Sequence, residues 1–496
     1  MKLYINGEIN SYYVQTLCML FFPGAKFSAE EALTDDSDVV TLTILHTDGG
    51  VTAKAEMRSG KRCALKERFE PFKDGVTKVK TAKIAAGVAI VAAGEELFEC
   101  TPPWGILTGV RPAKIAAQYV EAGLSSAQIR NALCTDYFLN PKKAALLTDI
   151  AEREAAIIAG TAPRTCSVYI SIPFCPTRCA YCSFVSYSTK RLLSMTDDYL
   201  ARLFDDIDRT FNRIASLGLR VATVYVGGGT PTVLEPEQIS ALLTKITSRV
   251  DPGSLSEFTF EAGRPDTVTA EKLKIIKSFG VTRISVNPQT LNDMVLENIG
   301  RKHTTEDFYR AYNIARESGI KYINTDLIAG LPSEGFYSFS RSVDEIIRLR
   351  PDNITFHTFC VKKASDFLRN GTEVYSRSGG ETGKSVDYSQ VAAGLAGYLP
   401  YYIYRQKNTV GNFENVGYAL KGAEGLYNIY MMEEVHSVFA AGAGAVTKLV
   451  APDRSVIKRA AMPKYPYEYL SDDIYRRAWE EKDATTDAFA GEYFKW

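Results

Sequence analysis

The chain of 496 residues has no excess of charge of either sign, because 58 lysines and arginines balance 58 aspartates and glutamates. No overall field therefore favours nucleic acid or an anionic membrane as a partner. Long apolar runs are missing as well. The longest uncharged apolar stretch, Ile84 to Gly94, falls well short of the ~20 residues that a membrane span needs. We therefore expect neither a membrane span nor a nucleic-acid partner.

Charge is unbalanced only locally. Between Val51 and Ala85, ten Lys or Arg residues accompany four Asp or Glu residues, a balance of 10 − 4 = +6. This stretch is either a solvated face of a small domain or a surface for an anionic partner. An RNA-binding surface would need exposed aromatic side chains among the cations, and Phe69 and Phe72 are the only aromatic residues there.

Signals of export are also absent. The first residues, MKLYINGEINS, include Glu8 and lack a basic segment followed by a long apolar one, so we expect a cytoplasmic location. In that compartment the nine cysteines are thiols or metal ligands rather than a disulfide framework. Six of them are scattered along the chain, which makes a second metal cluster improbable: Cys18, Cys63, Cys100, Cys134, Cys166 and Cys360.

Strands and helices alternate after about residue 167. The predicted strands are Val168–Ile172, Val221–Val226, Glu257–Glu261, Thr282–Val286, Lys321–Ile328 and Asn353–His357. The helix-length segments between them imply parallel βα units, and six strands are too few for a closed eight-stranded barrel. We predict an α/β fold with a partial (β/α)6 TIM-type barrel, whose chemistry lies in loops at the carboxyl ends of the strands.

Three domains are predicted along the chain. Residues 1–160 form an N-terminal accessory α/β domain, and residues 161–365 form the barrel. The alternation of strands and helices fades after about Ser365, so residues 366–496 are predicted as a separate, partly helical C-terminal domain.

Three cysteines follow the first predicted barrel strand with the spacing C-x3-C-x2-C: Cys175, Cys179 and Cys182. Thiolates are soft ligands that suit iron–sulfur clusters, and one short loop can wrap three of them around a cubane. Three ligands for four irons leave one iron open, as a catalytic site requires. The alternatives are a three-ligand zinc site without a nearby fourth ligand, or coincidence.

This loop resembles the signature of the radical S-adenosylmethionine (SAM) superfamily. The resemblance implies a [4Fe–4S] cluster and SAM as cofactors, with the open iron holding the methionine moiety of SAM. One electron, supplied by a donor such as flavodoxin or ferredoxin, then cleaves SAM to a radical that removes a hydrogen atom from the substrate. The cofactor supplies this reactivity, and the protein supplies position and exclusion of water.

Polar residues at the ends of the later strands suit a SAM cradle. The run Gly227, Gly228, Gly229, Thr230 follows the second strand and resembles the superfamily's GGxTP motif, which contacts the methionine amine. Backbone groups can approach a ligand closely at such glycines. Glu261, Gln289 and Asp326 lie at or near the ends of the third, fourth and fifth strands and should converge on one mouth.

Within the superfamily, the set Glu261, Gln289, Arg301, Asp326 resembles the oxygen-independent coproporphyrinogen III oxidase-like group. There the arginine binds the SAM carboxylate, for which a guanidinium is chemically apt, and the glutamine and aspartate address the ribose. Within that group the chain most resembles the HemZ branch, and the similarity includes 103–112, 404–407, 411–417 and 441–447. It implies that the C-terminal domain covers the substrate.

The resemblance implies a reaction on a tetrapyrrole: coproporphyrinogen III loses two carboxyl groups as two propionates become vinyl groups, in the pathway of porphyrin and haem biosynthesis. Tyr169 and Arg178 are the candidate catalytic residues. Arg178, and Arg405 with Lys407, are candidates for pairing with the carboxylates of the substrate, although solvated surface charge is an equal alternative.

Two departures leave other functions open. Ser171 stands where the oxidase has a histidine, and Ser183-Phe184 stand where it has a further cysteine. A serine cannot act as an imidazole-like proton shuttle. The ending of the cysteine loop is closer to the HemW branch, so a haem-binding or haem-trafficking protein is the alternative, as is action on another tetrapyrrole. The four histidines show no clustering typical of an axial haem site: His46, His303, His357 and His436.

Overall fold

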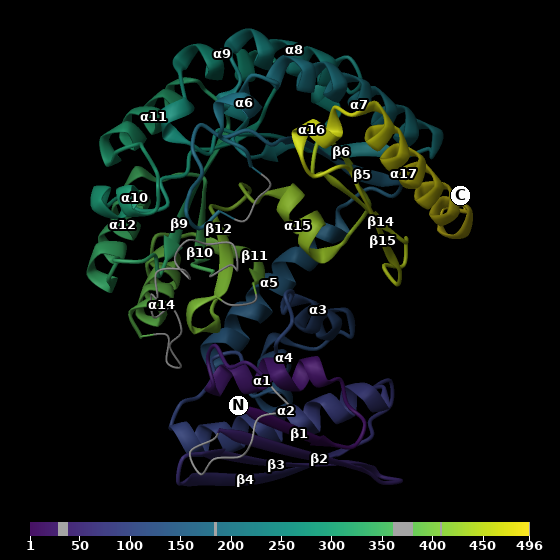
Figure 1. The fold of residues 1–496 in the computed structure, drawn as a ribbon, viewed down its shortest axis with the longest axis vertical. Coiled ribbons are helices and arrows are strands. Elements are labelled where there is room, and N and C mark those ends of the chain that lie inside the picture. The colour runs from purple at the N-terminus through teal and green to yellow at the C-terminus, as the bar shows by residue number, and fades with distance from the viewer. Residues whose placement is uncertain (28–37, 183–185, 361–379, 407–408, 496) are drawn as a thin grey trace. The chain divides into compact units, whose positions relative to one another are not determined.

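The computed structural model describes residues 1–27, 38–182, 186–360, 380–406 and 409–495. The chain divides into two compact units (Figure 1). Unit 1 comprises Met1–Glu152, Thr372–Lys384 and Tyr404–Glu414, and unit 2 comprises Arg153–Gly371, Ser385–Ile403 and Asn415–Trp496. The division into three domains stays a prediction. No helix in the described ranges is both long and apolar enough to cross a membrane.

Unit 1 contains a four-stranded sheet in the order β1-β2-β3-β4. Its strands are β1 (Lys2–Asn6), β2 (Val39–His46), β3 (Gly50–Ser59) and β4 (Arg62–Pro71). β1 is parallel to β2, and β2, β3 and β4 form an antiparallel meander. Alternate residues of β3 are buried (Val51, Ala53, Ala55 and Met57), which is the pattern of a sheet packed on one face.

Helix α2 (Lys78–Phe98) packs on this sheet, mainly against β3 and β4, and helix α1 (Ser11–Phe21) packs against α2. Figure 1 shows both helices on the same side of the sheet. α2 contains the apolar run that the sequence shows at 84–94, and in that run the helix is buried almost all round, as expected of a helix in a domain core. Further helices are α3 (Ala113–Glu121), α4 (Ser126–Tyr137) and α5 (Pro141–Ala159).

A buried polar network connects distant parts of unit 1. The Lys143 ammonium lies 2.5 Å from the Glu414 carboxylate, and the Trp104 indole N–H donates to the same carboxylate at 2.8 Å. The Lys143 and Glu414 side chains are 3% and 1% exposed. Arg405 is also buried, with its guanidinium over the Trp104 ring and its Nη1 donating to the carbonyl oxygen of Leu107. The side chains therefore fix each other in a water-free environment.

Replacing Glu414 by alanine is expected to reduce the free energy of unfolding by about 3–5 kcal/mol, because it leaves an ammonium and an indole N–H buried without this partner. Urea unfolding followed by tryptophan fluorescence measures the change. The control is Asp149→Asn, which breaks the surface pair of Arg130 and Asp149, whose side chains are 46% and 50% exposed. The control should cost about 1 kcal/mol or less, and an equal cost in the two variants would contradict the expectation.

Unit 2 is organised around the central strands of an eleven-stranded sheet. The strand order in this sheet is β11-β12-β10-β9-β8-β7-β6-β5-β13-β14-β15. Its first six strands by sequence are parallel neighbours. They are β5 (Thr165–Ile172), β6 (Arg220–Gly228), β7 (Glu257–Glu261), β8 (Arg283–Ser285), β9 (Tyr322–Ala329) and β10 (Asn353–Thr358). The six predicted parallel strands are confirmed, and the sheet is open rather than a closed barrel.

Helices follow the strands, as the βα pattern predicts, and form the outer layer in Figure 1. They are α6 (Lys190–Leu193), α7 (Thr196–Ser216), α8 (Pro236–Thr247), α9 (Ala270–Ser278), α10 (Asp293–Asn298), α11 (Thr305–Glu317) and α12 (Phe336–Leu349). The inward face of α7 shows why this layer is stable: Tyr199, Leu203, Ile207 and Phe211 recur at helical spacing and are buried.

The C-terminal part of the chain adds strands at both edges of the six parallel strands. They are β11 (Leu399–Arg405), β12 (Glu414–Ala419), β13 (Val438–Ala441), β14 (Val446–Val450) and β15 (Ile457–Ala461). β13 is parallel to β5, whereas β12 is antiparallel to β10. The remaining helices are α14 (Gly380–Leu395), α15 (Leu426–Glu433), α16 (Pro466–Tyr469) and α17 (Asp472–Tyr493).

Candidate functional site

The loop that carries the three cysteines begins where β5 ends. The backbone N–H of Cys175 donates to the carbonyl of Tyr187 at 3.0 Å, and that of Ala180 donates to the carbonyl of Ile299 at 3.0 Å. Cys175 and Cys179 are each 8% exposed, and Cys182 is partly exposed. Backbone hydrogen bonds thus hold the loop against the rest of unit 2. Two of its three thiols are buried, and the third is partly exposed.

Each of the three sulfurs has a polar neighbour. Cys175 Sγ lies 3.3 Å from Thr230 Oγ1, and Cys182 Sγ lies 3.7 Å from Ser186 Oγ. Arg264 Nη1 lies 3.7 Å from Cys179 Sγ. These contacts suit thiolates, which accept hydrogen bonds and gain from a nearby cation.

The neighbouring thiols also affect the pKa of Cys175. Burial raises the pKa of Cys175, and the neighbouring Cys182 and Cys179 raise it further. No group of three His, Cys, Asp or Glu side chains in the described ranges is placed to hold a single metal ion. A cubane differs from a single ion because each thiolate binds a different iron, so the sulfurs need not converge on one point. The donor set therefore fits a cluster of the predicted kind.

The glycine run at the end of β6 lies directly beside the cysteine loop. A Cβ on Gly229 would sit 2.5 Å from the carbonyl oxygen of Phe174 and 3.0 Å from Cys175 Sγ. A Cβ on Gly227 would sit 2.9 Å from Glu261 Oε2. Gly228 has φ +115°, which side-chain-bearing residues rarely adopt. Only glycine therefore lets the backbone after β6 lie this close to the cysteine loop and to Glu261. Thr230 adds a side-chain contact with Cys175.

Two predicted carboxylates lie on strands of this sheet: Glu261 is the last residue of β7, and Asp326 lies in β9, three residues before that strand ends. Burial, together with the negative charge of Asp326, raises the pKa of Glu261 to about 7, although a hydrogen bond from Tyr225 opposes the rise. Asp326 accepts from Asn324 Nδ2 at 2.7 Å and lies 3.5 Å from His357 Nε2. The structure thus brings Glu261 and Asp326 into one acidic mouth, as the sequence predicts.

Gln289 stands beside this mouth in an uncommon backbone conformation. Its φ is +73°, and its N–H donates to the carbonyl of Asp326 at 3.0 Å. The side chain is 7% exposed, and its Oε1 has no hydrogen-bond partner within the described part of the chain. A buried amide oxygen without a partner is a strained arrangement that a bound ligand would relieve.

Arg301 is the fourth member of the predicted set. It is 8% exposed, its Nε donates to Tyr181 Oη at 3.1 Å, and its Nη1 donates to the carbonyl of Asn287 at 2.7 Å. Tyr181 lies between the second and third cysteines, so this bond ties the guanidinium to the cysteine loop. Neither bond uses Nη2, which keeps donor capacity for a carboxylate.

Of the two candidate catalytic residues, Tyr169 is half-buried and Arg178 is exposed. The ring of Tyr169 stacks with those of Tyr225 and Tyr427 at centroid distances of 6.1 and 6.4 Å. Tyr225 and Tyr427 stack at 4.5 Å. Arg178 belongs to the cysteine loop, and its Nη1 donates to the carbonyl of Ser186 at 3.5 Å. The tyrosines form a stacked wall next to Glu261.

Sequence reasoning missed Tyr427, because nothing near it indicated that α15 packs beside β6. The helix is held by its first backbone amides: Leu426 and Tyr427 donate to the carboxylate of Glu257 at 2.9 and 3.2 Å. Arg283 Nε donates to the same carboxylate at 3.1 Å. A carboxylate at a helix N-terminus is a favourable arrangement. Arg264 was also missed, although a cation three residues beyond Glu261, at the end of a strand, was a usable signal.

Ser171, Arg405 and Lys407 were the other residues of interest. The Ser171 hydroxyl donates to the carbonyl of Ala443 at 3.0 Å, inside the glycine-rich segment 441–447. Arg405 was suggested to pair with substrate carboxylates, but its guanidinium is buried among carbonyl groups of unit 1, including those of Leu107 and Asn412. Lys407 lies outside the described residues.

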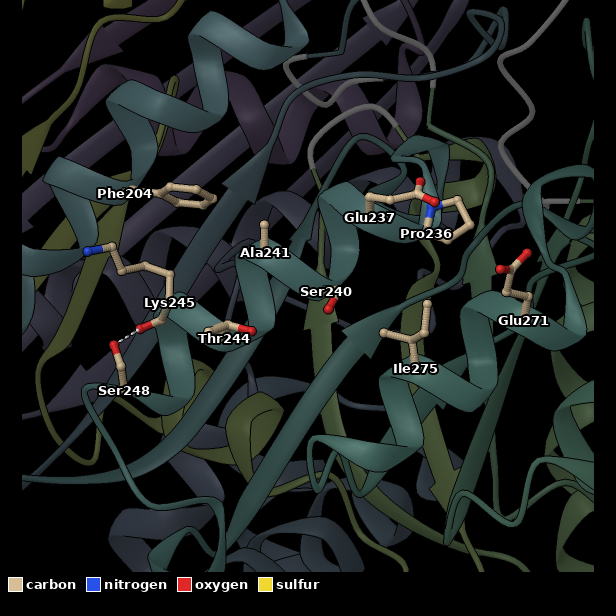
Figure 2. Close-up of a pocket in the computed structure, with 10 residues that line it drawn as sticks. All are labelled: Phe204, Pro236, Glu237, Ser240, Ala241, Thr244, Lys245, Ser248, Glu271 and Ile275. Carbon is tan, nitrogen blue, oxygen red and sulfur yellow. Dashed lines mark hydrogen bonds between the residues drawn. The ribbon is translucent and has the colours of Figure 1, made fainter.

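The hollow drawn in Figure 2 lies elsewhere. It is open to solvent, and its lining side chains come from α7, α8 and α9 in the outer helical layer. They include Phe204, Ser240, Lys245 and Ile275 and none of the predicted site residues. The candidate site is instead defined by the cysteine loop and the ends of the parallel strands.

Comparisons with known proteins agree with this geometry. The family model of the radical SAM superfamily matches residues 169–346. The oxygen-independent coproporphyrinogen-III oxidase-like protein HemZ of Bacillus subtilis is 36% identical over 441 residues, which cover 87% of this chain and 87% of that protein. Heme chaperone HemW of the same organism is 31% identical and covers 61% of this chain and 77% of its own.

Among the solved structures that this chain resembles, the following one is similar in fold. It is that of coproporphyrinogen III oxidase (HemN) from Escherichia coli, described as a radical SAM enzyme. The TM-score is 0.51 at 22% identity, with 66% of this chain and 73% of that chain covered. At this identity the likeness concerns the fold, and it supports the predicted open barrel.

Proposed function

Because the chain belongs to the oxygen-independent coproporphyrinogen III oxidase-like family of radical SAM proteins, which use a [4Fe–4S] cluster and SAM, we propose that it is a coproporphyrinogen III dehydrogenase. The observation that carries the proposal is the meeting of the cysteine loop, the glycine run and the strand-end carboxylates at one edge of the sheet. Each propionate would lose one hydrogen atom to the radical derived from SAM, then carbon dioxide, and one electron to a one-electron acceptor such as oxidised flavodoxin or ferredoxin, to become a vinyl group.

The residues of this chain have separate tasks in the proposal. Cys175, Cys179 and Cys182 would hold the cluster, and the chemistry that it would supply when bound is the one-electron reduction of SAM. Gly227 to Thr230, together with Glu261, position the amine of SAM. Arg301 positions its carboxylate, and Gln289 and Asp326 position its ribose. The wall of Tyr169, Tyr225 and Tyr427 excludes water from the reacting atoms. The electron would come from a donor such as flavodoxin or ferredoxin.

A second candidate function is haem binding or trafficking. Two observations favour it: a relative named heme chaperone HemW is 31% identical, and the position where the oxidase has a histidine holds Ser171, whose hydroxyl donates to the Ala443 carbonyl. Action on a different tetrapyrrole is compatible with the same site.

One assay separates these functions. The protein is reconstituted anaerobically with iron and sulfide and incubated with SAM, dithionite and coproporphyrinogen III. Formation of protoporphyrinogen IX together with 5′-deoxyadenosine supports the dehydrogenase. Deoxyadenosine without a porphyrin product points to another substrate, and stoichiometric haem binding without turnover supports the carrier; either result would overturn the proposed reaction.

The proposed role of Glu261 predicts a pH-dependent affinity for SAM. Since the pKa of Glu261 is raised to about 7, the carboxylate becomes protonated as the pH falls from 8 to 6 and loses its attraction for the methionine ammonium. The Kd of SAM should rise by up to about tenfold per pH unit below 7. Anaerobic calorimetry measures it. The Glu261→Gln variant should bind more weakly at pH 8 and show a flat profile; an equal slope in both proteins would contradict the role.

A further inference from the structure

Arg264 is a buried cation beside the cysteine loop to which neither the sequence analysis nor the proposed reaction gives a task. The residue is 3% exposed. Its Nε and Nη2 donate to the two carboxylate oxygens of Asp266 at 2.9 and 3.0 Å, which fixes the plane of the guanidinium. Its Nη1 points to the cysteine loop, where it lies 3.0 Å from Thr177 Oγ1 and 3.7 Å from Cys179 Sγ.

The backbone around Arg264 is fixed as firmly as its side chain. The carbonyl of Arg264 accepts from Thr267 twice, from its N–H at 3.0 Å and from its hydroxyl at 2.8 Å. The Thr267 hydroxyl also lies 2.7 Å from that of Thr232, which follows the glycine run. A long side chain with so little freedom loses little further entropy when it binds, which is typical of a preorganised site.

We propose that Arg264 is a positioning residue that orders the cysteine loop through Thr177 and favours the reduced state of the cluster by donating an N–H to the Cys179 sulfur. The proposal rests on the ligand role given to Cys179 above.

The physical reason is electrostatic. Reduction adds a negative charge that is shared with the ligand sulfurs, and a hydrogen bond from a cation stabilises the more negative state more strongly. Water competes little for a side chain that is 3% exposed, so the effect is not screened. Asp266 partly offsets the charge of Arg264. However, its carboxylate accepts hydrogen bonds from Nε and Nη2 of Arg264, so Nη1 stays directed to the Cys179 sulfur.

The test is a potentiometric titration of the reconstituted protein, followed by electron paramagnetic resonance, with iron and sulfide content determined in parallel. In Arg264→Gln the midpoint potential should become more negative. At the wild-type midpoint, the ratio of reduced to oxidised cluster should fall by about tenfold, the lower end of what removing a partner of a metal ligand costs. Arg264→Lys keeps the charge without the fork and should shift the potential in the same direction but by less.

The matched control is Arg310→Gln, at an exposed arginine of α11 that pairs with Asp307, and it should leave the potential unchanged. If Arg264→Gln holds a full cluster and its midpoint potential equals that of the wild type, the proposal is overturned. If that variant retains no iron, Arg264→Lys decides: a more negative midpoint supports the proposal, and an unchanged one overturns it. The titration needs no turnover of coproporphyrinogen, so failure of the proposed reaction and failure of this inference are distinguishable.

Discussion

Replacing Cys179 by alanine is expected to abolish SAM cleavage, because the loop would then offer two thiolates where a cubane with one open iron needs three. Cys179 is buried and lies within 3.7 Å of Arg264 Nη1, so the variant also leaves that guanidinium without its sulfur partner. Iron and sulfide content after anaerobic reconstitution should fall far below the wild-type value. Production of 5′-deoxyadenosine should drop to the level seen without protein.

The control for this variant is Cys63→Ser. Cys63 is an exposed cysteine in β4 of unit 1 and has no part in the proposed site. We expect the control to keep wild-type iron content and wild-type SAM cleavage. If Cys179→Ala retained both, the assignment of the loop as the cluster site would be wrong.

Replacing Arg301 by glutamine has the second largest expected effect. The guanidinium is buried, and a charge-assisted hydrogen bond is worth about 1.5–3 kcal/mol, so its loss should raise the Kd of SAM by about 10- to 100-fold. The neutral side chain also leaves the Asn287 carbonyl without its charged donor. Anaerobic calorimetry with SAM measures the affinity.

The cluster content serves as an internal check on Arg301→Gln, since Arg301 donates its hydrogen bond to the loop at Tyr181, which is not one of the proposed ligands. We expect the variant to hold iron at nearly the wild-type level and to lose affinity for SAM. Arg310→Gln is the control and should bind SAM normally. Normal affinity in Arg301→Gln would contradict the role of Arg301 as the partner of the SAM carboxylate.

The barrel strands could be predicted from the sequence because each is a short β-rich run that alternates with a helix-length segment. The predicted run Glu257–Glu261 coincides with β7, and Asn353–His357 differs from β10 by one residue. The carboxyl ends of parallel strands lie along one edge of the sheet, so the sequence could also predict that the charge of Asp326 acts on Glu261.

Other features depend on contacts between residues far apart in the chain. The strands after residue 365 join both sides of the barrel sheet, and no local pattern predicts which existing edge a late strand will find. The wall of Tyr225 and Tyr427 likewise depends on the placement of α15, which is set by Glu257 more than 160 residues earlier. Arg405 looked like a surface cation because burial of an arginine follows from tertiary contacts alone.

The central claim is that three thiols in one loop hold a cubane whose fourth iron takes SAM. Electron paramagnetic resonance of the anaerobically reconstituted and reduced protein, recorded with and without SAM, tests it most directly. The account predicts the signal of a reduced [4Fe–4S] cluster that changes when SAM is added. Absence of a cubane signal, or the same signal in a variant with all three cysteines replaced by alanine, would contradict it.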